Sequence, residues 1–414
     1  MKKTASLMIL LAAAFAVSGS LSGCSILNRV SAPVFSIAGG VYYGQQTVAL
    51  STATPGATIY YTVDGTDPSQ SSTLYSGAIP ISATTTVRAI AVAPLIINSD
   101  ISQATYTIKN VYVAGYERNV AEEIAKYWKN GEGADLSPSA RANSIFVSGA
   151  DIHAAGYAGD YLAKYWKNGL AFNLTSGAHF AAAYSVYVSG ANVYVAGYES
   201  NGSVSVAKYW LNGVATNLTD GAHDAEAYSV FAAGADVYAA GYESNGSVHV
   251  AKYWKNNAGT VTVLTDGSHD AEAHSIFVSG ADVYAAGSAS NGTADIAKYW
   301  KNGVAVDLTT EAMGSSCAYS IFIAGADVYA AGSSPQGGVN NRAVYWKNGL
   351  LMPLTDGSHE AEALSIFVFG SDVFVAGFES NGTVDVAKYW KNGVEVKLTD
   401  GTNNASAEAV FIGD

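Results

Sequence analysis

The sequence predicts an all-β protein, in which a small β-sandwich is followed by a seven-bladed β-propeller closed by the C-terminal strand. Two observations lead to this expectation. Short alternating apolar runs separated by Gly, Pro and Asn-Gly turns fill the chain, and no segment shows a helical period. Beyond residue 110 the chain also repeats itself about every 44 residues, a period typical of propellers and solenoids.

Residues 1–23 have the layout of an export signal, with Lys2 and Lys3 before a short apolar stretch. The next motif, Leu21-Ser22-Gly23-Cys24, resembles the lipobox of bacterial lipoproteins. That resemblance implies cleavage before Cys24, acylation of its thiol, and attachment to the membrane through lipid alone. Ser25 stands where that family carries an Asp as its inner-membrane retention cue, so the expected location is the bacterial cell envelope, at the outer membrane. An ordinary secretory signal is the alternative.

The charge and cysteine content exclude several classes of function. The chain has 34 acidic and 21 basic residues and a net charge of −13, which argues against a nucleic-acid partner. Removal of residues 1–23 takes away two lysines and no acid, so the net charge becomes −15. If Cys24 is acylated, Cys317 is the one remaining thiol. It has no basic neighbour in sequence, so we expect a small buried side chain rather than a nucleophile.

Residues 33–109 follow a linker, residues 24–32, and contain short strands broken by Pro-Gly and Asp-Gly. The segment Pro55–Pro68, with Leu74-Tyr75-Ser76-Gly77, Thr84–Ala89 and Ala104–Ile108, resembles the chitobiase/β-hexosaminidase C-terminal type of domain. The resemblance implies an immunoglobulin-like accessory module without catalytic residues. A turn is the favoured interpretation of Asp-Gly-Thr-Asp-Pro in this segment, over a metal-binding loop.

Residues 110–414 form the predicted propeller. One tryptophan marks each repeat, mostly within Lys-Tyr-Trp-Lys-Asn-Gly, and we expect these large rings to pack between blades. The tryptophans are Trp128, Trp166, Trp210, Trp254, Trp300, Trp346 and Trp390. Each repeat has four strand-like runs, and two of the three hairpins in the third repeat carry Asn-Gly, which favours a type I′ turn. The segment begins at a second run and ends with a first run, Ala409–Gly413, so the ends can share a blade and close a ring. An open solenoid is the alternative, and the repeat matches no propeller family that we can name.

The topology sorts the loops onto two faces. The first face carries Gly-Ala-Asp and Trp-Lys-Asn-Gly hairpins whose charges cancel. The second face collects acids, His residues and aromatic rings, and it is the candidate binding face. Its residues are Tyr198, Glu199, His223, Asp224, Glu226, Tyr242, Glu243, His269, Asp270, Glu272, His359, Glu360, Glu362, Phe378 and Glu379.

The recurring His-Asp/Glu-Ala-Glu of this face could supply ligands to a divalent metal, with calcium as the one cofactor considered. The favoured interpretation is a turn whose polar side chains bond local backbone, because other blades lack the motif. No cofactor is expected.

Three functions remain open on the sequence alone. The preferred one is a non-catalytic, lipid-anchored envelope protein that binds a protein or a polysaccharide through a propeller face. A glycan-active hydrolase or lyase is the first alternative, weakened because the acids recur from blade to blade while catalysis needs one unequal pair. Recurring serines such as Ser185 and Ser229 are likewise expected to be structural hydroxyls. A structural or self-assembling envelope protein is the second alternative.

Overall fold

The structure is a computed structural model that describes residues 29–159 and 162–414. The predicted lipidation site, Cys24, lies outside this range. The chain divides into two compact units, one formed by residues 29–40, 47–81 and 85–106, the other by residues 41–46, 82–84 and 107–414. In the part of the chain described, no helix has the length and apolar character needed to span a membrane.

The first unit is a small all-β domain. Its strands β5 (Thr58–Thr62), β8 (Thr85–Val92) and the beginning of β9 (Ser102–Arg118) form an antiparallel sheet, with β6 (Thr73–Leu74) beside β5. Two short pairs complete it. They are β1 (Val34–Phe35) with β4 (Leu50–Ser51), and β3 (Gln46–Val48) with β7 (Ile79–Ile81). In the Asp-Gly-Thr-Asp-Pro segment, the Asp64 carboxylate accepts hydrogen bonds from the backbone N–H and the hydroxyl of Thr66. This segment therefore contains the predicted turn.

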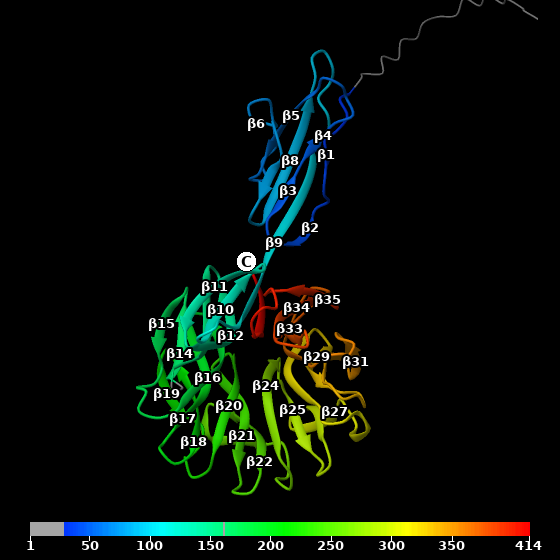
Figure 1. The fold of residues 1–414 in the computed structure, drawn as a ribbon. Coiled ribbons are helices and arrows are strands. Elements are labelled where there is room, and N and C mark those ends of the chain that lie inside the picture. Colours follow the sequence, from blue (N-terminus) through cyan, green and yellow to red (C-terminus); the bar gives the residue numbers. More distant parts are fainter. Residues whose placement is uncertain (1–28, 160–161) are drawn as a thin grey trace, which may run out of the picture. The chain divides into compact units, whose positions relative to one another are not determined.

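The second unit is a β-propeller, and Figure 1 shows its blades following one another round a ring. Six blades are four-stranded antiparallel sheets of consecutive strands. They are β12 (Ala140–Ser148), β13 (Asp151–Ala158), β14 (Leu162–Lys167) and β15 (Leu170–Asn173); β16 (Ala181–Ser189), β17 (Asn192–Ser200), β18 (Ser205–Leu211) and β19 (Val214–Asn217); β20 (Ala225–Ala233), β21 (Asp236–Ser244), β22 (His249–Lys255) and β23 (Asn257–Val263); β24 (Ala271–Ser279), β25 (Asp282–Ser290), β26 (Asp295–Lys301) and β27 (Val304–Asp307); β28 (Cys317–Ala324), β29 (Asp327–Ser334), β30 (Arg342–Lys347) and β31 (Leu350–Pro353); β32 (Ala361–Phe369), β33 (Asp372–Ser380), β34 (Asp385–Lys391) and β35 (Val394–Lys397).

The two ends of this unit meet in one set of strands. The C-terminal strand β36 (Ala405–Gly413) pairs antiparallel with residues 110–117 of β9, which also pairs with β10 (Glu123–Lys129). The strand β11 (Glu132–Pro138) then pairs with β10. The last strand of the chain is therefore hydrogen-bonded to the first strand of the propeller segment.

The hairpins show where the turn prediction is right and where it is wrong. Between β18 and β19, Asn212 and Gly213 have φ of 50° and 84°, as the predicted type I′ turn requires. The second Asn-Gly, between β17 and β18, forms a longer loop in which only Gly202 has a positive φ. There the Asn201 Oδ1 accepts hydrogen bonds from the backbone N–H groups of Ser203 and Val204, a side-chain cap that replaces the tight turn.

Every inner strand of the propeller carries a β-bulge at the same place. In β20 the register shifts between Ala227 and Ser229, and the other inner strands shift at the equivalent residues. The backbone approaches its neighbour closely there. A Cβ on Gly241 of β21 would lie 1.8 Å from the Glu226 carbonyl oxygen, which explains the glycine of the repeated Ala-Ala-Gly.

The serine that follows each bulge joins one blade to the next. The Ser229 Oγ accepts a hydrogen bond of 3.2 Å from the backbone N–H of Ile276 in the next inner strand. Ser144, Ser185, Ser275, Ser320 and Ser365 make the same contact. The prediction that these recurring serines are structural is confirmed. In β36 the equivalent residue is Ala409, whose side chain cannot accept a hydrogen bond.

A closed circuit of aromatic rings lines the ring of inner strands. Two residues after each of these serines, or after Ala409, stands an aromatic side chain that contacts its counterparts on both sides, with centroids 4.5 to 5.1 Å apart. The seven residues are Phe146, Tyr187, Phe231, Phe277, Phe322, Phe367 and Phe411. The circuit has no break, because Phe411 contacts both Phe367 and Phe146.

The tryptophans pack between blades, as predicted. Each is at most 2% exposed and lies in its own apolar cluster with residues of the preceding blade. Trp254, for example, packs with Ala207 and Leu218 of the blade before it. Such rings bury a large apolar area and hold neighbouring sheets together.

The serine contacts predict opposite effects for two substitutions. Ser229→Ala leaves the Ile276 N–H without its acceptor, so we expect the free energy of unfolding to fall by about 1–3 kcal/mol. Ala409→Ser supplies the acceptor that β36 lacks and should raise the free energy by about 1 kcal/mol. Denaturant titration followed by tryptophan fluorescence measures both. Unchanged midpoints in the two variants would show that these hydrogen bonds do not contribute to the stability.

Candidate functional site

The first face of the propeller is electrostatically compensated. Its hairpins place an aspartate beside a lysine in five blades, with N–O distances of 2.7 to 3.2 Å. The pairs are Asp151–Lys167, Asp236–Lys255, Asp282–Lys301, Asp327–Lys347 and Asp372–Lys391. The charges therefore cancel as the sequence predicts.

Three glutamates of the predicted binding face are also paired. The carboxylates of Glu199, Glu243 and Glu379 accept hydrogen bonds from Lys208, Lys252 and Lys388 of the adjacent strand. The Lys208 side chain is only 10% exposed, and the Glu199 carboxylate is its ion-pair partner at 2.7 Å. These glutamates belong to ion pairs within single blades.

The motif His-Asp/Glu-Ala-Glu divides into two parts with different surroundings. Its first two residues lie on the loops between blades. The imidazoles of His223, His269 and His359 lie against the glycines of the adjacent loop, Gly246, Gly292 and Gly382. The carboxylates of Asp224, Asp270 and Glu360 accept backbone hydrogen bonds from Ser205, His249 and Asn341.

The carboxylates therefore bond backbone N–H groups, as the favoured interpretation expects, but these groups lie 19 to 21 residues away, at or next to the third strand of the preceding blade, and not in the turn itself. In the described ranges, no three His, Cys, Asp or Glu side chains gather closely enough to hold a metal ion.

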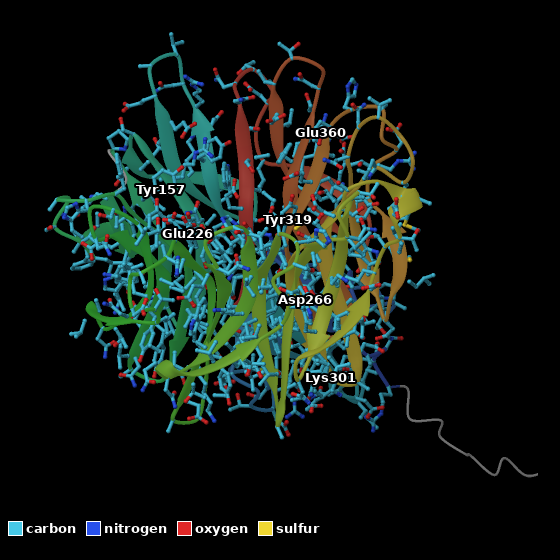
Figure 2. The ribbon with its side chains drawn as sticks, turned by 90° about the horizontal axis from the view of Figure 1, so that it is seen from below. Tyr157, Glu226, Asp266, Lys301, Tyr319 and Glu360 are labelled. Carbon is cyan, nitrogen blue, oxygen red and sulfur yellow. The ribbon has the colours of Figure 1, made fainter. Side chains whose placement is uncertain are left out.

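The last glutamate of the motif lies at the centre of the ring. Glu226, Glu272 and Glu362 stand two residues before the bulged position of their inner strands, and Figure 2 shows Glu226 and Tyr319 toward the middle of the molecule and Lys301 near its edge. The Tyr184 hydroxyl donates a hydrogen bond of 2.9 Å to Glu226, and the Tyr319 hydroxyl donates one of 3.2 Å to Glu362. Each bond joins one inner strand to the next.

The bulged residues themselves form an aromatic arc. Tyr184, Tyr228, His274 and Tyr319 come from four successive inner strands, and their ring centroids are 5.0 to 5.5 Å apart. Sequence reasoning missed these four residues. The signal was an aromatic residue directly before the recurring serine and, in β20 and β24, two positions after the glutamate, where strand alternation places both on one face. The contacts between successive inner strands depend on neighbours that are distant in sequence.

Burial changes the ionisation of this central cluster. Desolvation raises the pKa of the Glu226 carboxyl from its ordinary value of 4.5 to about 7, and it raises that of Glu362 equally. Burial also raises the pKa of Glu408, the bulged residue of β36, and lowers that of the His274 imidazole. The centre of the second face therefore holds carboxyl groups that exchange protons near neutral pH.

The remaining predicted residues are Tyr198, Tyr242 and Phe378. In the strand pairing they stand opposite Ala182, Glu226 and Glu362 of the inner strands. Tyr242 is stacked with His249, with centroids 3.8 Å apart and planes inclined by 17°. The His249 Nδ1 lies 2.8 Å from Glu272. The imidazole therefore bridges an aromatic ring and a carboxylate of two neighbouring blades.

Other blades break the symmetry of the centre. Arg141 takes the place of the central glutamate in β12, binds both oxygens of Glu123, and stacks over the Tyr116 ring at 4.1 Å. Cys317 takes it in β28, where burial raises the pKa of its thiol well above the ordinary value. That shift agrees with the prediction of an unreactive thiol.

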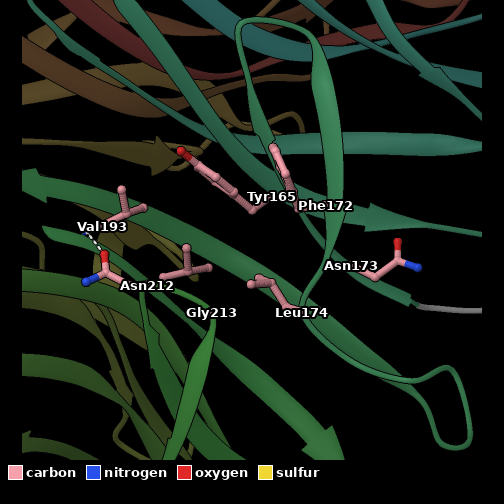
Figure 3. Close-up of a pocket in the computed structure, with 8 residues that line it drawn as sticks. Tyr165, Phe172, Asn173, Leu174, Val193, Asn212 and Gly213 are labelled. Carbon is pink, nitrogen blue, oxygen red and sulfur yellow. Dashed lines mark hydrogen bonds between the residues drawn. The ribbon is translucent and has the colours of Figure 1, made fainter. Parts of the chain in front are cut away.

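Two hollows of the propeller differ in chemistry. The first, about 320 Å³, lies between β14–β15 and β17–β19 and is lined by apolar groups such as Phe172, Leu174 and Val193 (Figure 3). Both of its asparagines are already bonded, Asn212 to the Val193 N–H and Asn173 to the Lys164 ammonium group. The second, about 270 Å³, lies on the second face and is lined by Phe180, Tyr198, Ser200, Ser203, Val204, Ser205 and Asp224.

Comparison with known proteins identifies one segment. The family model described as chitobiase/beta-hexosaminidase C-terminal domain matches residues 37–105, which confirms the domain type predicted there. An endoglucanase of Clostridium saccharobutylicum is 41% identical over 56 residues, which are 14% of this chain and 12% of the endoglucanase.

Among solved structures, a quinonprotein alcohol dehydrogenase-like protein of Bacteroides thetaiotaomicron is 10% identical, with 95% of this chain and 98% of that chain covered and a TM-score of 0.38. A likeness of this extent says nothing about the chemistry of this chain.

The raised carboxyl pKa values predict a pH dependence of stability. Between pH 4.5 and about 7 the folded state keeps protons on Glu226 and Glu362 that the unfolded chain releases. These two groups therefore lower the free energy of unfolding as the pH rises through this window, by up to about 3 kcal/mol each, and their contribution levels off above it.

The variant Glu226→Gln/Glu362→Gln cannot ionise at these positions. Its stability relative to the wild type should therefore increase from pH 4.5 to 7.5 in denaturant titrations, while groups common to both proteins cancel. Parallel pH profiles for the two proteins would contradict the shifts.

Proposed function

We propose that this chain is a non-catalytic envelope protein that binds a protein or a polysaccharide with the second face of its propeller. The observation that supports this is the central cluster of Tyr184, Tyr228, His274 and Tyr319 beside buried carboxyl groups. The fold does not need every member of this cluster, because Ala182 stands in β16 at the position of Glu226, and Leu364 stands in β32 at the position of Tyr228. Buried carboxyl groups cost stability, and a binding role explains why they are kept.

The chemistry of the cluster defines the kind of partner. Aromatic rings offer flat apolar faces, tyrosine hydroxyls donate and accept hydrogen bonds, and carboxylates accept them. The acidic loops around the cluster, which include Asp224 and Asp270, disfavour anionic partners. A polysaccharide rich in hydroxyl groups or a neutral or cationic protein surface matches this combination.

Ring closure in the proposal rests on the strand set β36–β9–β10–β11. We count this set as the seventh blade, because β36 supplies the inner strand and the aromatic circuit passes through Phe411. A closed ring leaves no blade without a neighbour on either side and holds the central cluster in fixed geometry.

The first test of the proposal is a binding screen. The purified full-length protein in mild detergent is immobilised and exposed to a panel of glycans and envelope proteins. Tyr228→Ala should weaken the binding of the selected ligand by about tenfold or more, and Lys301→Ala on the first face should leave it unchanged. Equal loss in both variants, or none in Tyr228→Ala, would argue against the central cluster as the site.

A glycan-active enzyme is the second candidate, and one observation favours it. A carboxyl group with a pKa of about 7, as at Glu226 and Glu362, meets the requirement for a general acid. The test is whether the wild type releases reducing ends from a bound glycan. If it does, and Glu226→Gln does not, the protein is a glycan-active enzyme rather than a binding protein.

The envelope location is part of the proposal and rests on the lipobox resemblance. Cys24→Ala should remove the acylated thiol, so the protein should move from the detergent-extracted membrane fraction to the aqueous fraction. Cell fractionation with immunodetection measures this. An unchanged distribution would show that Cys24 is not the anchor.

A further inference from the structure

A third hollow, of about 400 Å³, lies on the second face of the blade β24–β27. Its walls come from the end of β25, the strand β26, and the segment after β27, which contains the short 3₁₀ helix η1 (Glu311–Met313). The volume is within the range of about 300–1,000 Å³ that is usual for small-molecule sites. The lining includes three apolar and three charged side chains, which are Ile296, Leu308, Met313, Lys298, Asp307 and Glu311.

Lys298 occupies a position that has a recurring partner in four other blades. In those blades the third strand carries a lysine opposite a glycine of the second strand, and a glutamate two residues after that glycine binds the lysine at 2.5 to 2.7 Å. The pairs are Lys126–Glu117, Lys208–Glu199, Lys252–Glu243 and Lys388–Glu379. Lys298 stands opposite Gly287 in the same way, but the residue at the glutamate position is Ala289. This blade therefore keeps the ammonium group and lacks the glutamate.

The partner that Lys298 does have takes a different place. In residues 29–159 and 162–414, Asp307 is the one carboxylate paired with Lys298, at 2.7 Å. Lys126 shows that an ammonium group at this position can hold two carboxylates, since it binds Glu117 at 2.6 Å and Asp135 at 3.3 Å. Asp135 pairs with Lys126 in the ladder as Asp307 pairs with Lys298. The place of the second carboxylate, beside Ala289, belongs to the hollow in this blade.

Another wall of the hollow carries a second departure from the repeat. In three other blades a loop asparagine donates its side-chain amide to the carbonyl oxygen of a glycine, as Asn201 does to Gly221, the third residue after Leu218. The third residue after Leu308 is instead Glu311, and its carboxylate accepts the bond from the Asn291 Nδ2 at 3.2 Å. Glu311 is exposed, and an amide rather than a cation holds its carboxylate at the hollow.

No other blade combines both departures in the described part of the chain. The blade β12–β15 has Ala158 at the glutamate position but keeps the loop glycine, Gly177. In the blade β28–β31 the lysine and the glutamate are absent together, with Val344 and Ser334 in their places. Only in the blade β24–β27 does a lysine without its glutamate share a hollow with an added carboxylate.

We propose that this hollow binds a free α-amino acid with an apolar side chain. The ligand carboxylate takes the place of the missing glutamate on Lys298, and the ligand ammonium group binds the Glu311 carboxylate. The ligand side chain contacts the apolar wall of Ile296, Leu308 and Met313. The inference goes beyond the proposed function, because none of these residues belongs to the central cluster.

The charge of the hollow selects a zwitterion over a simple acid. One ammonium group and two carboxylates, those of Asp307 and Glu311, already line it. A ligand that brings an ammonium group together with its carboxylate leaves this balance unchanged, whereas a simple acid adds a third negative charge. The net charge of −13 on the chain also disfavours an anion and does not act against a neutral zwitterion.

Ala289→Glu tests the site without removing a contact of the fold. It restores the carboxylate that four other blades carry, which should pair with Lys298 and occupy the place of the ligand carboxylate. Binding of L-leucine to the full-length protein, measured by calorimetry and ligand-detected NMR, should therefore weaken about tenfold or more. Lys301→Met lowers the net charge by the same amount but lies on the first face, so it should bind leucine like the wild type. Melting curves of both variants check that the fold is intact.

Ligand analogues separate the two charged contacts. N-acetyl-leucine keeps the carboxylate and lacks the ammonium group, whereas leucinamide keeps the ammonium group and lacks the carboxylate. Each should bind the wild type about tenfold or more weakly than leucine does. Glu311→Gln should weaken leucine binding by a similar factor and leave the binding of N-acetyl-leucine unchanged, because that analogue has no ammonium group to lose.

Four results would overturn the inference. The first is the absence of leucine binding by the wild type at a ligand concentration of about 20 mM, at which a site with a Kd near 1 mM is nearly full. The second is wild-type affinity for leucine in Ala289→Glu. The others are leucinamide or N-acetyl-leucine binding as tightly as leucine, which would remove the carboxylate or the ammonium contact from the site. Each of these results is independent of Tyr228→Ala, so a failure here is distinct from a failure of the proposed function.

Discussion

The bulge of each inner strand is the constraint on which the rest of the propeller depends. It turns Ser229 and its equivalents toward the next blade, where their hydroxyls accept a backbone hydrogen bond, and it requires glycine on the facing strand, as at Gly241. The same shift brings side chains on both sides of it to the centre of the ring. Phe231 can therefore take part in the aromatic circuit, and Tyr228 and Glu226 in the polar cluster, although simple alternation along the strand would separate them. Stability and candidate function thus depend on one local irregularity that recurs round the ring.

The regular features of this propeller could be predicted from sequence, and the irregular ones could not. The period of the tryptophans, the Asn212-Gly213 turn and the pairing of Asp236 with Lys255 follow from residue patterns that act locally. Three features did not follow from such patterns: the first is a choice between two local turns, and the other two depend on partners in another strand or blade. The Asn201 side chain caps its own loop, Lys208 neutralises Glu199, and the bulge brings Tyr184 to Glu226 of the next blade. The repeated His-Asp/Glu-Ala-Glu motif indicates the glutamates of the site, but it groups them with loop residues whose carboxylates bond backbone N–H groups.

The structure shows which charged groups are paired, which are exposed and which are buried, whereas the composition gives only their number. Most carboxylates on the hairpins of the first face are held by lysines, and Glu199, Glu243 and Glu379 of the second face are held in the same way. The aspartates of the loops between blades, such as Asp266, accept hydrogen bonds from the residue two positions further on and stay exposed to water. Burial is the main influence on the carboxyls at the centre, and it raises the pKa of Glu226 and Glu362 to about 7. A net negative charge therefore does not by itself make the whole second face a binding surface. The carboxyl groups whose pKa burial raises lie at the middle of that face.

A repeated frame makes a single departure from the repeat informative, because the other blades show what the fold itself requires. In the described residues, every bulged inner strand faces a glycine, and each tryptophan of the repeat packs between sheets. No blade needs an imidazole at the position of His249, since Ser205 stands there in the neighbouring blade and its backbone N–H donates the equivalent hydrogen bond. In one of these two blades the His249 ring lies over Tyr242. In the other, a hollow of about 270 Å³ is lined by residues that include Tyr198 and Asp224. Because the same backbone geometry is present in both blades, the difference between them is a difference of side chains and is not required by the fold.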